Sequence, residues 1–248
     1  RVFVMTDWQN ATEIDFYNES DIHYTMRILA QLHIAGEGFD APGGNVREAK
    51  IKNLGVTYEK RYKETIKLKK RISNVGNKTD FEVLYFQNAS KYIELQEMAM
   101  GLFYQEDYKK LIELARNKQT IAHHQYTYHH IKKIDEDHVV VSGFERSRYD
   151  VQLTDLVYVI KRIMQKNQWD IDLLLKIIDS YNKIRPLSPN EWTIMQGMII
   201  FPDKFSKLCN TYYYSKRKWN YNMFYRKFDN MLEYQDAQIK CAKEVLRW

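Results

Sequence analysis

Four histidines lie in one short stretch of the chain: His123, His124, His129 and His130. Imidazole is the commonest ligand of transition metals, and either His124 with His129 or His123 with His130 could converge on zinc or nickel. No cysteine or carboxylate nearby completes a recognisable metal site. We therefore predict no metal site and expect His123 to support the loop. Metal binding by this group stays as the alternative.

The same stretch has the layout of a phosphoryl-transfer site. A kinase-type loop needs a carboxylate that accepts the hydroxyl proton and, five residues later, an amide oxygen that binds magnesium. After a short β-hairpin, a second carboxylate bridges the metal and the nucleotide phosphates. Those three positions read Gln125, His130 and Gly143, and an acidic residue, Glu145, follows. An amide, an imidazole and a hydrogen atom cannot fill these roles, so the stretch indicates a fold and argues against the reaction.

The composition is typical of a helical globular domain. Of the 248 residues, 44% are hydrophobic and 28% are charged, and the chain is long enough to bury a substantial core. Only 9 glycines and 4 prolines are present, which argues against a sandwich or a barrel, whereas 19 tyrosines are unusual. We find no internal repeat, low-complexity segment or linker, and predict a single domain over residues 1–248.

The net charge of +6 would suit an anionic partner such as nucleic acid. The positive charges are not gathered in one tail, however, and the densest runs are Lys60–Arg71 and Lys216–Lys218. Such runs are more often solvated helix faces than binding patches, so we do not predict a nucleic-acid partner.

Cys209 and Cys241 are the two cysteines, and their spacing has no metal-site signature. We expect reduced, structural thiols in an intracellular compartment. No signal peptide is visible and no apolar run approaches transmembrane length, so we predict no membrane span.

The first half of the chain predicts one strand and then helices. Residues 1–8 alternate like a strand, and Asn18–Asp21 opens a helix with apolar residues three and four apart. Thr79 caps a long helix that we expect to run to about Arg116. Between them we predict a loop and a basic helix, at Ala35–Asn53 and Tyr58–Ile72.

The apolar period then changes to two, which predicts a β-hairpin from Ile131–Ile134 and Val139–Val141 around an acidic turn. The rest of the chain is predicted to be helical, with helices at Leu153–Gln168, Asp170–Ile184, from Ser188 onward, Lys204–Tyr214 and Tyr221–Arg247. The predicted fold is therefore mostly α with a small β-hairpin.

This order of elements resembles the C-terminal lobe of an aminoglycoside-phosphotransferase-type kinase. The second half is also similar to the CotS-type spore coat proteins, a branch of that superfamily. The segments that carry this resemblance are His123–Ile131, Arg148–Val151 with Asp155–Leu156, Leu187–Phe205 and Tyr212–Trp219. The start of the chain, Val2–Trp8, looks like the hinge strand that joins the two lobes.

The resemblance implies a kinase-like C-terminal lobe in which residues 121–145 are a vestigial catalytic loop and hairpin and residues 153–248 are helical. The family's N-terminal lobe would then lie ahead of Arg1, absent from this chain. The resemblance also implies a place in the spore coat after synthesis in the mother-cell cytoplasm, with other coat proteins as partners.

In the family's pattern the catalytic aspartate falls at Gln125, the magnesium-binding asparagine at His130 and the metal-strand carboxylate at Gly143. We therefore predict no catalytic residue and no cofactor, in a pseudokinase-like protein that works through protein–protein contacts. The alternative is an ATP-dependent small-molecule phosphotransferase with a displaced site, in which Glu145 is the sole metal ligand.

Other polar residues invite simpler interpretations. We expect Asp150 or Asp155 to hydrogen-bond the loop backbone, and Glu145 to be solvated. The segment Tyr212–Tyr225 could stack nucleic-acid bases, but tyrosines interleaved with lysines in helical register are more often half-buried. Exposed tyrosines would instead suit contacts within an assembly, and oxidative cross-linking.

Overall fold

The computed structural model describes residues 10–40, 51–135, 138–214 and 221–248. The predicted hinge strand and the basic run at Lys216–Lys218 lie outside these ranges. Helices dominate the described residues, as predicted. No helix among them is long and apolar enough to cross a membrane.

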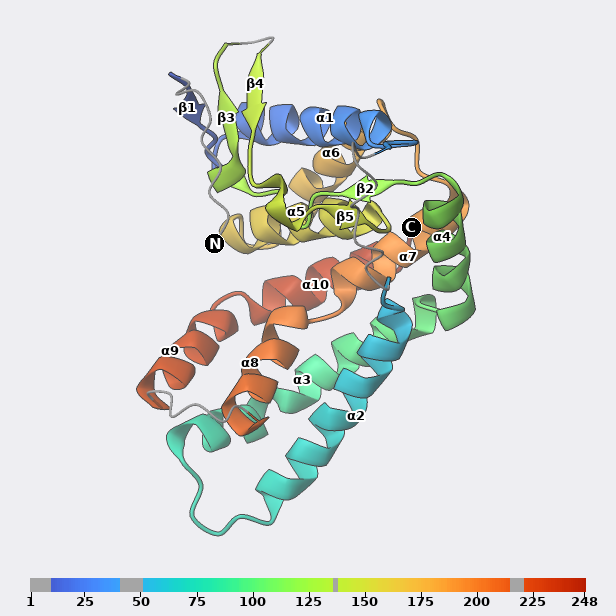
Figure 1. Cartoon of the computed structure of the whole chain (residues 1–248). Helices are drawn as coiled ribbons and strands as arrows, with labels where there is room; N and C mark the ends of the chain where they lie inside the picture. The colour runs from blue at the N-terminus through green and yellow to red at the C-terminus, as the bar shows by residue number, and fades with distance from the viewer. Residues whose placement is uncertain (1–9, 41–50, 136–137, 215–220) are drawn as a thin grey trace.

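Figure 1 shows two parts joined by a middle layer. The upper part holds the strands and the helices α1 (Glu19–Ala35), α5 (Leu153–Lys166) and α6 (Ile171–Asn182). The lower part is built from α2 (Leu54–Ser73), α3 (Asp80–Leu102), α8 (Asp203–Tyr214) and α9 (Tyr221–Leu232). Between them lie α4 (Gln105–Asn117), α7 (Pro189–Ile200) and α10 (Gln235–Val245). Because α7 contacts α3, α4, α5 and α10, it connects the two parts.

The predicted helix starts are confirmed where a polar cap sets them. The side chain of Asn18 accepts the N–H of Asp21, and Ser188 forms a reciprocal capping box with Glu191. The side chain of Asn53 also caps α2 by accepting backbone N–H groups, so this helix begins four residues before the predicted Tyr58.

The single helix predicted from Thr79 to about Arg116 is wrong, because α3 ends at Leu102 and α4 begins at Gln105. The backbone of Phe103 leaves the helical region, with φ −104° and ψ 84°. Its ring is buried between Tyr58 and Tyr108, with centroid distances of 5.1 Å and 5.3 Å. The break buries this ring and turns α4 onto α7.

The long terminal helix predicted over Tyr221–Arg247 is also wrong. It divides into α9 and α10 at Glu233 and Tyr234, where Tyr234 has φ −117° and ψ 10°. The division lets α9 pack against α3 and α8 while α10 packs against α7.

Two small sheets complete the upper part. The predicted hairpin is confirmed as β3 (Ile131–Lys133) and β4 (Val139–Val141), which pair antiparallel with Ile131 opposite Val141. A short strand that was not predicted, β1 (Thr12–Glu13), adds to the other edge of β3. The second sheet joins β2 (Ile121–Ala122) to β5 (Arg148–Tyr149) and closes the loop that contains the histidines.

Stacked aromatic rings fill the core of the lower part. Tyr92 stacks on Phe205 at 4.0 Å, and Tyr212 stacks on Phe81 at 4.1 Å. The packing interpretation is therefore confirmed for Tyr212, whereas Tyr214 is 56% exposed. The two cysteines are buried and free, as predicted for structural thiols.

Three cations of the basic run on α2 have carboxylate partners. Lys60 and Lys63 pair with Glu64 and Glu59 of the same helix, and Arg61 donates to Asp203 at 2.6 Å. The predicted solvated helix face is thus confirmed for the two lysines, while Arg61 links α2 to α8.

Candidate functional site

One buried carboxylate holds the loop that follows β2. Asp155, in the first turn of α5, accepts the backbone N–H of His123 and, at 2.8 Å, that of His124. The backbone of His124 is left-handed, with φ 62°, which is uncommon for a residue with a side chain. Asp155 is 1% exposed. The prediction that this residue supports the loop backbone is confirmed.

A histidine from α1 completes the surroundings of Asp155. The Nε2 atom of His33 lies 3.6 Å from Asp155 Oδ2, and Nδ1 lies 2.6 Å from the hydroxyl oxygen of Tyr181. Burial lowers the pKa of His33 despite the neighbouring carboxylate. Burial alone would raise the pKa of Asp155, but His33, His124 and the N–H of His123 outweigh it, and the pKa is lowered. A neutral imidazole therefore faces an ionised carboxylate. Sequence reasoning missed His33, since nothing in the spacing links it to the loop.

His123 ties the loop to the hairpin. Its Nδ1 accepts the N–H of Gln125 at 3.1 Å, so Nε2 carries the proton that it donates to the carbonyl of Ser142 at 2.9 Å. The ring is buried, and burial lowers its pKa. Both ring nitrogens are occupied, which confirms the supporting role predicted for this residue.

Gln125 stands where a kinase-type loop would carry its base, and it is bonded on both sides. In the orientation of its amide that satisfies both groups, Gln125 donates to Glu145 Oε1 at 2.9 Å and accepts from Arg146 Nε at 3.0 Å. Glu145 is exposed, as predicted, but this bond couples it to the loop. These two bonds join the loop to the turn η2 (Phe144–Arg146).

Of the two positions expected to hold magnesium, His130 leaves no room for a side chain at the other, Gly143. Gly143 has φ 85°, and a Cβ atom there would lie 2.6 Å from Nδ1 and 2.9 Å from Cγ of His130. The imidazole therefore fills the space that a metal-binding side chain at position 143 would need.

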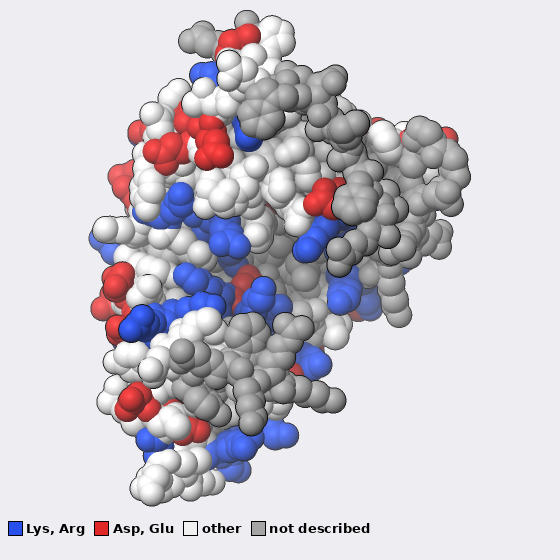
Figure 2. All heavy atoms as spheres, turned by 60° about the vertical axis from the view of Figure 1, so that its left-hand side comes forward, with Lys and Arg blue, Asp and Glu red and all other residues white. Residues whose placement is uncertain are grey.

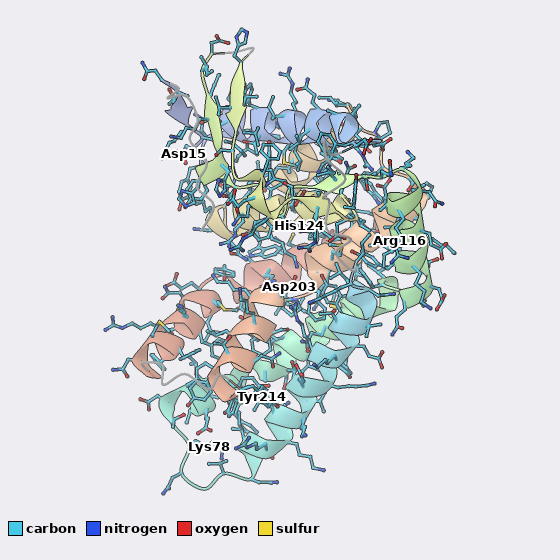
Figure 3. The ribbon with its side chains drawn as sticks, viewed as in Figure 1. Asp15, Lys78, Arg116, His124, Asp203 and Tyr214 are labelled. Atoms are coloured by element: carbon cyan, nitrogen blue, oxygen red, sulfur yellow. The ribbon has the colours of Figure 1, made fainter. Side chains whose placement is uncertain are left out.

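Asp150 holds a side chain of the loop, not its backbone. One oxygen lies 3.2 Å from Nε2 of His124 and accepts from Arg148 at 3.1 Å, while the other accepts the N–H of Val151. Of the two acids predicted to support the loop backbone, Asp155 alone does so among the described residues. In Figure 3, His124 lies in the upper part, above Asp203 at the start of α8.

The structure does not bring the four histidines together as a ligand set. His124 faces Asp150, and His129 is exposed with its ring 4.0 Å from that of Tyr128. The rings of His123 and His130 are 6.2 Å apart. Within the described part of the chain, no three His, Cys, Asp or Glu side chains are grouped so as to hold a metal ion.

Comparisons with known proteins identify the family to which this chain is similar. The sequence model of the family described as "Spore coat putative kinase YutH" matches residues 7–245. Spore coat protein S of Bacillus subtilis (strain 168) is 18% identical over 245 residues, which make up 95% of this chain and 67% of that protein. The predicted resemblance to spore coat proteins of the kinase-like superfamily is confirmed.

Solved structures share the fold. An aminoglycoside phosphotransferase from Alicyclobacillus acidocaldarius has a TM-score of 0.79 and 15% identity, over 97% of this chain and 70% of that one. A spectinomycin phosphotransferase, solved with ADP and spectinomycin, has a TM-score of 0.58 and 10% identity, over 96% and 69%. The predicted aminoglycoside-phosphotransferase-like fold is confirmed, while the N-terminal lobe ahead of Arg1 stays a prediction.

We expect Asp155→Asn to lower the free energy of unfolding by about 3 kcal/mol. Asparagine can accept one of the two loop N–H groups but turns its own NH₂ group toward the other. Asp179→Asn is the matched control, because that carboxylate is 56% exposed and pairs only with Lys183 among the described residues. The control should change stability by less than about 0.5 kcal/mol in a urea titration. Equal losses in the two variants would contradict the role of Asp155.

The steric conflict between the His130 ring and any side chain at position 143 predicts that replacing Gly143 costs more stability than replacing Gly38. Gly143→Ala should cost about 3 kcal/mol, because it adds a clash with His130 to the strain of a positive φ. Gly38→Ala, at φ 69° with nothing within 4 Å of the new Cβ, should cost about 1 kcal/mol. Thermal unfolding measures both, and His130→Ala should recover part of the Gly143→Ala loss. Failure of that recovery would contradict the steric conflict.

Stability should also fall as the pH drops below about 6.5, the usual pKa of histidine. His33 and His123 have lowered pKa values when folded, so the unfolded chain binds more protons in that range. Urea midpoints measured from pH 7.5 to 5 should show this slope, and His33→Gln should reduce it. A midpoint that stays constant or rises toward pH 5 would refute the assignment.

Proposed function

Because the chain belongs to the YutH family of spore coat proteins, we propose that it acts in the spore coat without transferring phosphate. In this proposal it is a kinase-derived scaffold that contacts other coat proteins. Each of the three positions that would carry phosphoryl-transfer chemistry now serves the packing of the loop.

The observation that carries the proposal is the placement of the His130 ring against Gly143. A carboxylate at position 143 would be needed to bridge a metal ion to nucleotide phosphates, and the imidazole fills its space. Gln125 adds to this, because a neutral amide has no useful proton affinity and its two polar ends bond Glu145 and Arg146. Neither position 125 nor position 143 then supplies a carboxylate to accept the hydroxyl proton or hold magnesium.

The bonds that give the loop its shape use different residues. Asp155 binds the loop backbone, His123 bonds the carbonyl of Ser142, and the hydroxyl of Tyr126 donates to the carbonyl of Thr25 at 2.9 Å. A loop that keeps these contacts can retain its form after its chemistry is lost. This supports a role in which shape, and not turnover, matters.

Exposed tyrosines support contacts with other proteins. Tyrosine is enriched in protein interfaces, since its ring provides apolar area and its hydroxyl a hydrogen bond. Among the described side chains, the tyrosines with the largest exposed fractions are Tyr17 at 65%, Tyr104 at 62%, Tyr214 at 56% and Tyr158 at 39%. These side chains suit an assembly of many neighbours and are candidates for oxidative cross-linking.

The alternative is a phosphotransferase with a displaced site, in which Glu145 would bind the metal ion. In that case the carboxylate would have to exchange its bond with Gln125 for the metal. We favour the scaffold because one exposed carboxylate provides neither a base nor a second metal ligand.

The test is nucleotide binding by the full-length protein as encoded, measured by titration calorimetry with ATP in the presence and absence of magnesium. We expect no magnesium-dependent gain in affinity. The matched variant Gln125→Asp/His130→Asn/Gly143→Asp returns the three groups and removes the obstructing ring, so it should bind ATP with magnesium more tightly than the native chain. Clear magnesium-dependent affinity in the native chain, or phosphate transfer to any acceptor, would overturn the proposal.

A further inference from the structure

Three basic side chains follow one another along the end of α5 and the start of α8. Arg162 and Lys166 are four residues apart on α5, so they share one face of the helix, about 6 Å apart along its axis. Burial and the positive charge of Arg162 both lower the pKa of Lys204, in the first turn of α8, which shows that these two cations are neighbours. We call Arg162, Lys166 and Lys204 the basic stripe. Figure 2, in which the left-hand side of Figure 1 comes forward, shows Lys and Arg side chains in a band across the middle of that face.

No carboxylate balances the basic stripe. Within the described part of the chain, none of its three cations forms an ion pair with an acidic side chain. One reason is the sequence of α5, whose single acidic residue, Asp155, binds the histidine loop. Another is that Asp203, the neighbour of Lys204, already accepts from both Arg61 and Lys161. The positive charge of the stripe therefore faces the solvent unpaired.

Tyrosine rings hold the two cations of α5 in place. The ammonium nitrogen of Lys166 lies 4.9 Å from the ring centre of Tyr17 and 4.4 Å from that of Tyr128. The guanidinium of Arg162 lies 5.1 Å from the ring centre of Tyr158 and donates to its hydroxyl at 2.9 Å. A ring face attracts a cation but carries no net charge, so these contacts position the cations without neutralising them.

The cation of α8 is held in the same manner. Lys204 lies 5.4 Å from the ring centre of Tyr234 and donates to its hydroxyl at 2.9 Å. An ammonium has three N–H donors and a guanidinium has five, so one bond to a hydroxyl leaves donors for a partner. Glu233, which precedes Tyr234, is exposed and forms no ion pair with the stripe among the described residues.

The arrangement of cations and rings favours an acidic protein over a nucleic acid. Sites for single-stranded nucleic acid use open aromatic faces on which bases stack. Here a cation covers a face of each ring, so the rings serve the cations and do not form a stacking platform. The distance of about 6 Å between Arg162 and Lys166 along α5 also matches that between two glutamates four residues apart on a partner helix.

We propose that the basic stripe binds an acidic segment of another protein, whose carboxylates pair with Arg162, Lys166 and Lys204. Arg162 and Lys204 are exposed and Lys166 is half-buried. Because the tyrosines already restrict these long side chains, binding costs less conformational entropy than it would with free lysines. This proposal rests on the proposed scaffold role and names the chemistry of its partner. ATP binding tests the histidine loop and the experiment below tests the stripe, so either can fail without the other.

The test follows the fluorescence anisotropy of a labelled helical peptide, in which glutamate recurs at every fourth position, during titration with the full-length protein as encoded. The same peptide with glutamine in place of glutamate and a single-stranded oligouridylate are the controls. We expect saturable binding of the acidic peptide that weakens as salt is added, and weaker binding of both controls. Absence of saturable binding, or binding of either control as tight as that of the acidic peptide, would overturn the proposal.

Two variants of the stripe separate charge from fold. Arg162→Gln/Lys166→Gln/Lys204→Gln should weaken binding of the acidic peptide about tenfold or more, through loss of three exposed ion pairs. Lys166→Arg/Lys204→Arg keeps the charges and the contacts with the rings, and should bind within about twofold of the native chain. Circular dichroism should show the native helical content in both variants. Equal loss of binding in the two variants would count against recognition by charge.

A matched control removes the same charges from another place. Arg116→Gln/Lys109→Gln/Lys110→Gln also replaces one arginine and two lysines, all exposed on α4. Figure 3 shows Arg116 on the opposite side of the molecule from Asp15, which lies two residues before Tyr17. Because both triple variants lower the net charge equally, a general effect of charge would weaken binding to the same extent in each. We expect the α4 variant to bind within about twofold of the native chain, and equal weakening by the two triple variants would overturn the proposal.

Discussion

The arrangement of the upper part depends on the carboxylate of Asp155. From the first turn of α5 it accepts two consecutive N–H groups of the loop, and it faces His33 of α1, which in turn bonds Tyr181 of α6. Three helices and the loop thus meet at one buried charge. An ionised carboxylate is tolerated there because N–H donors and a neutral imidazole replace its water. This charge accepts the N–H of His124, whose backbone has the left-handed conformation.

Local chemistry in the sequence was enough to predict the elements that it controls. The helix starts at Asn18 and Ser188 and the hairpin at Ile131 follow from side chains within a few residues of each other. The breaks at Phe103 and Tyr234 could not be predicted in this way, because apolar periodicity continues on both sides of each break. They arise from tertiary burial, as the ring of Phe103 between two tyrosines shows.

In the candidate site, too, some features could be predicted from the sequence and others could not. The layout of the sequence identified Gln125, His130 and Gly143 as the positions where a phosphotransferase would carry its base and metal ligands. Spacing could not tell that the His130 ring occupies the room beside Gly143, or that Gln125 bonds Arg146, since these contacts form only when the hairpin folds over the loop. The contact of His33 with Asp155 could not be predicted either, because it also forms only in the folded chain.

The two polar regions of the chain differ in how their charges are balanced. Around the loop, Asp150 has Arg148, Asp155 has its N–H donors, and the polar ends of Gln125 meet Glu145 and Arg146. At the start of α8, the carboxylate of Asp203 serves both Arg61 and Lys161, while Lys204 bonds only a tyrosine hydroxyl among the described residues. Polar groups that satisfy one another have little left to offer a ligand. By this argument Gln125, whose two polar ends are already bonded, serves the loop itself.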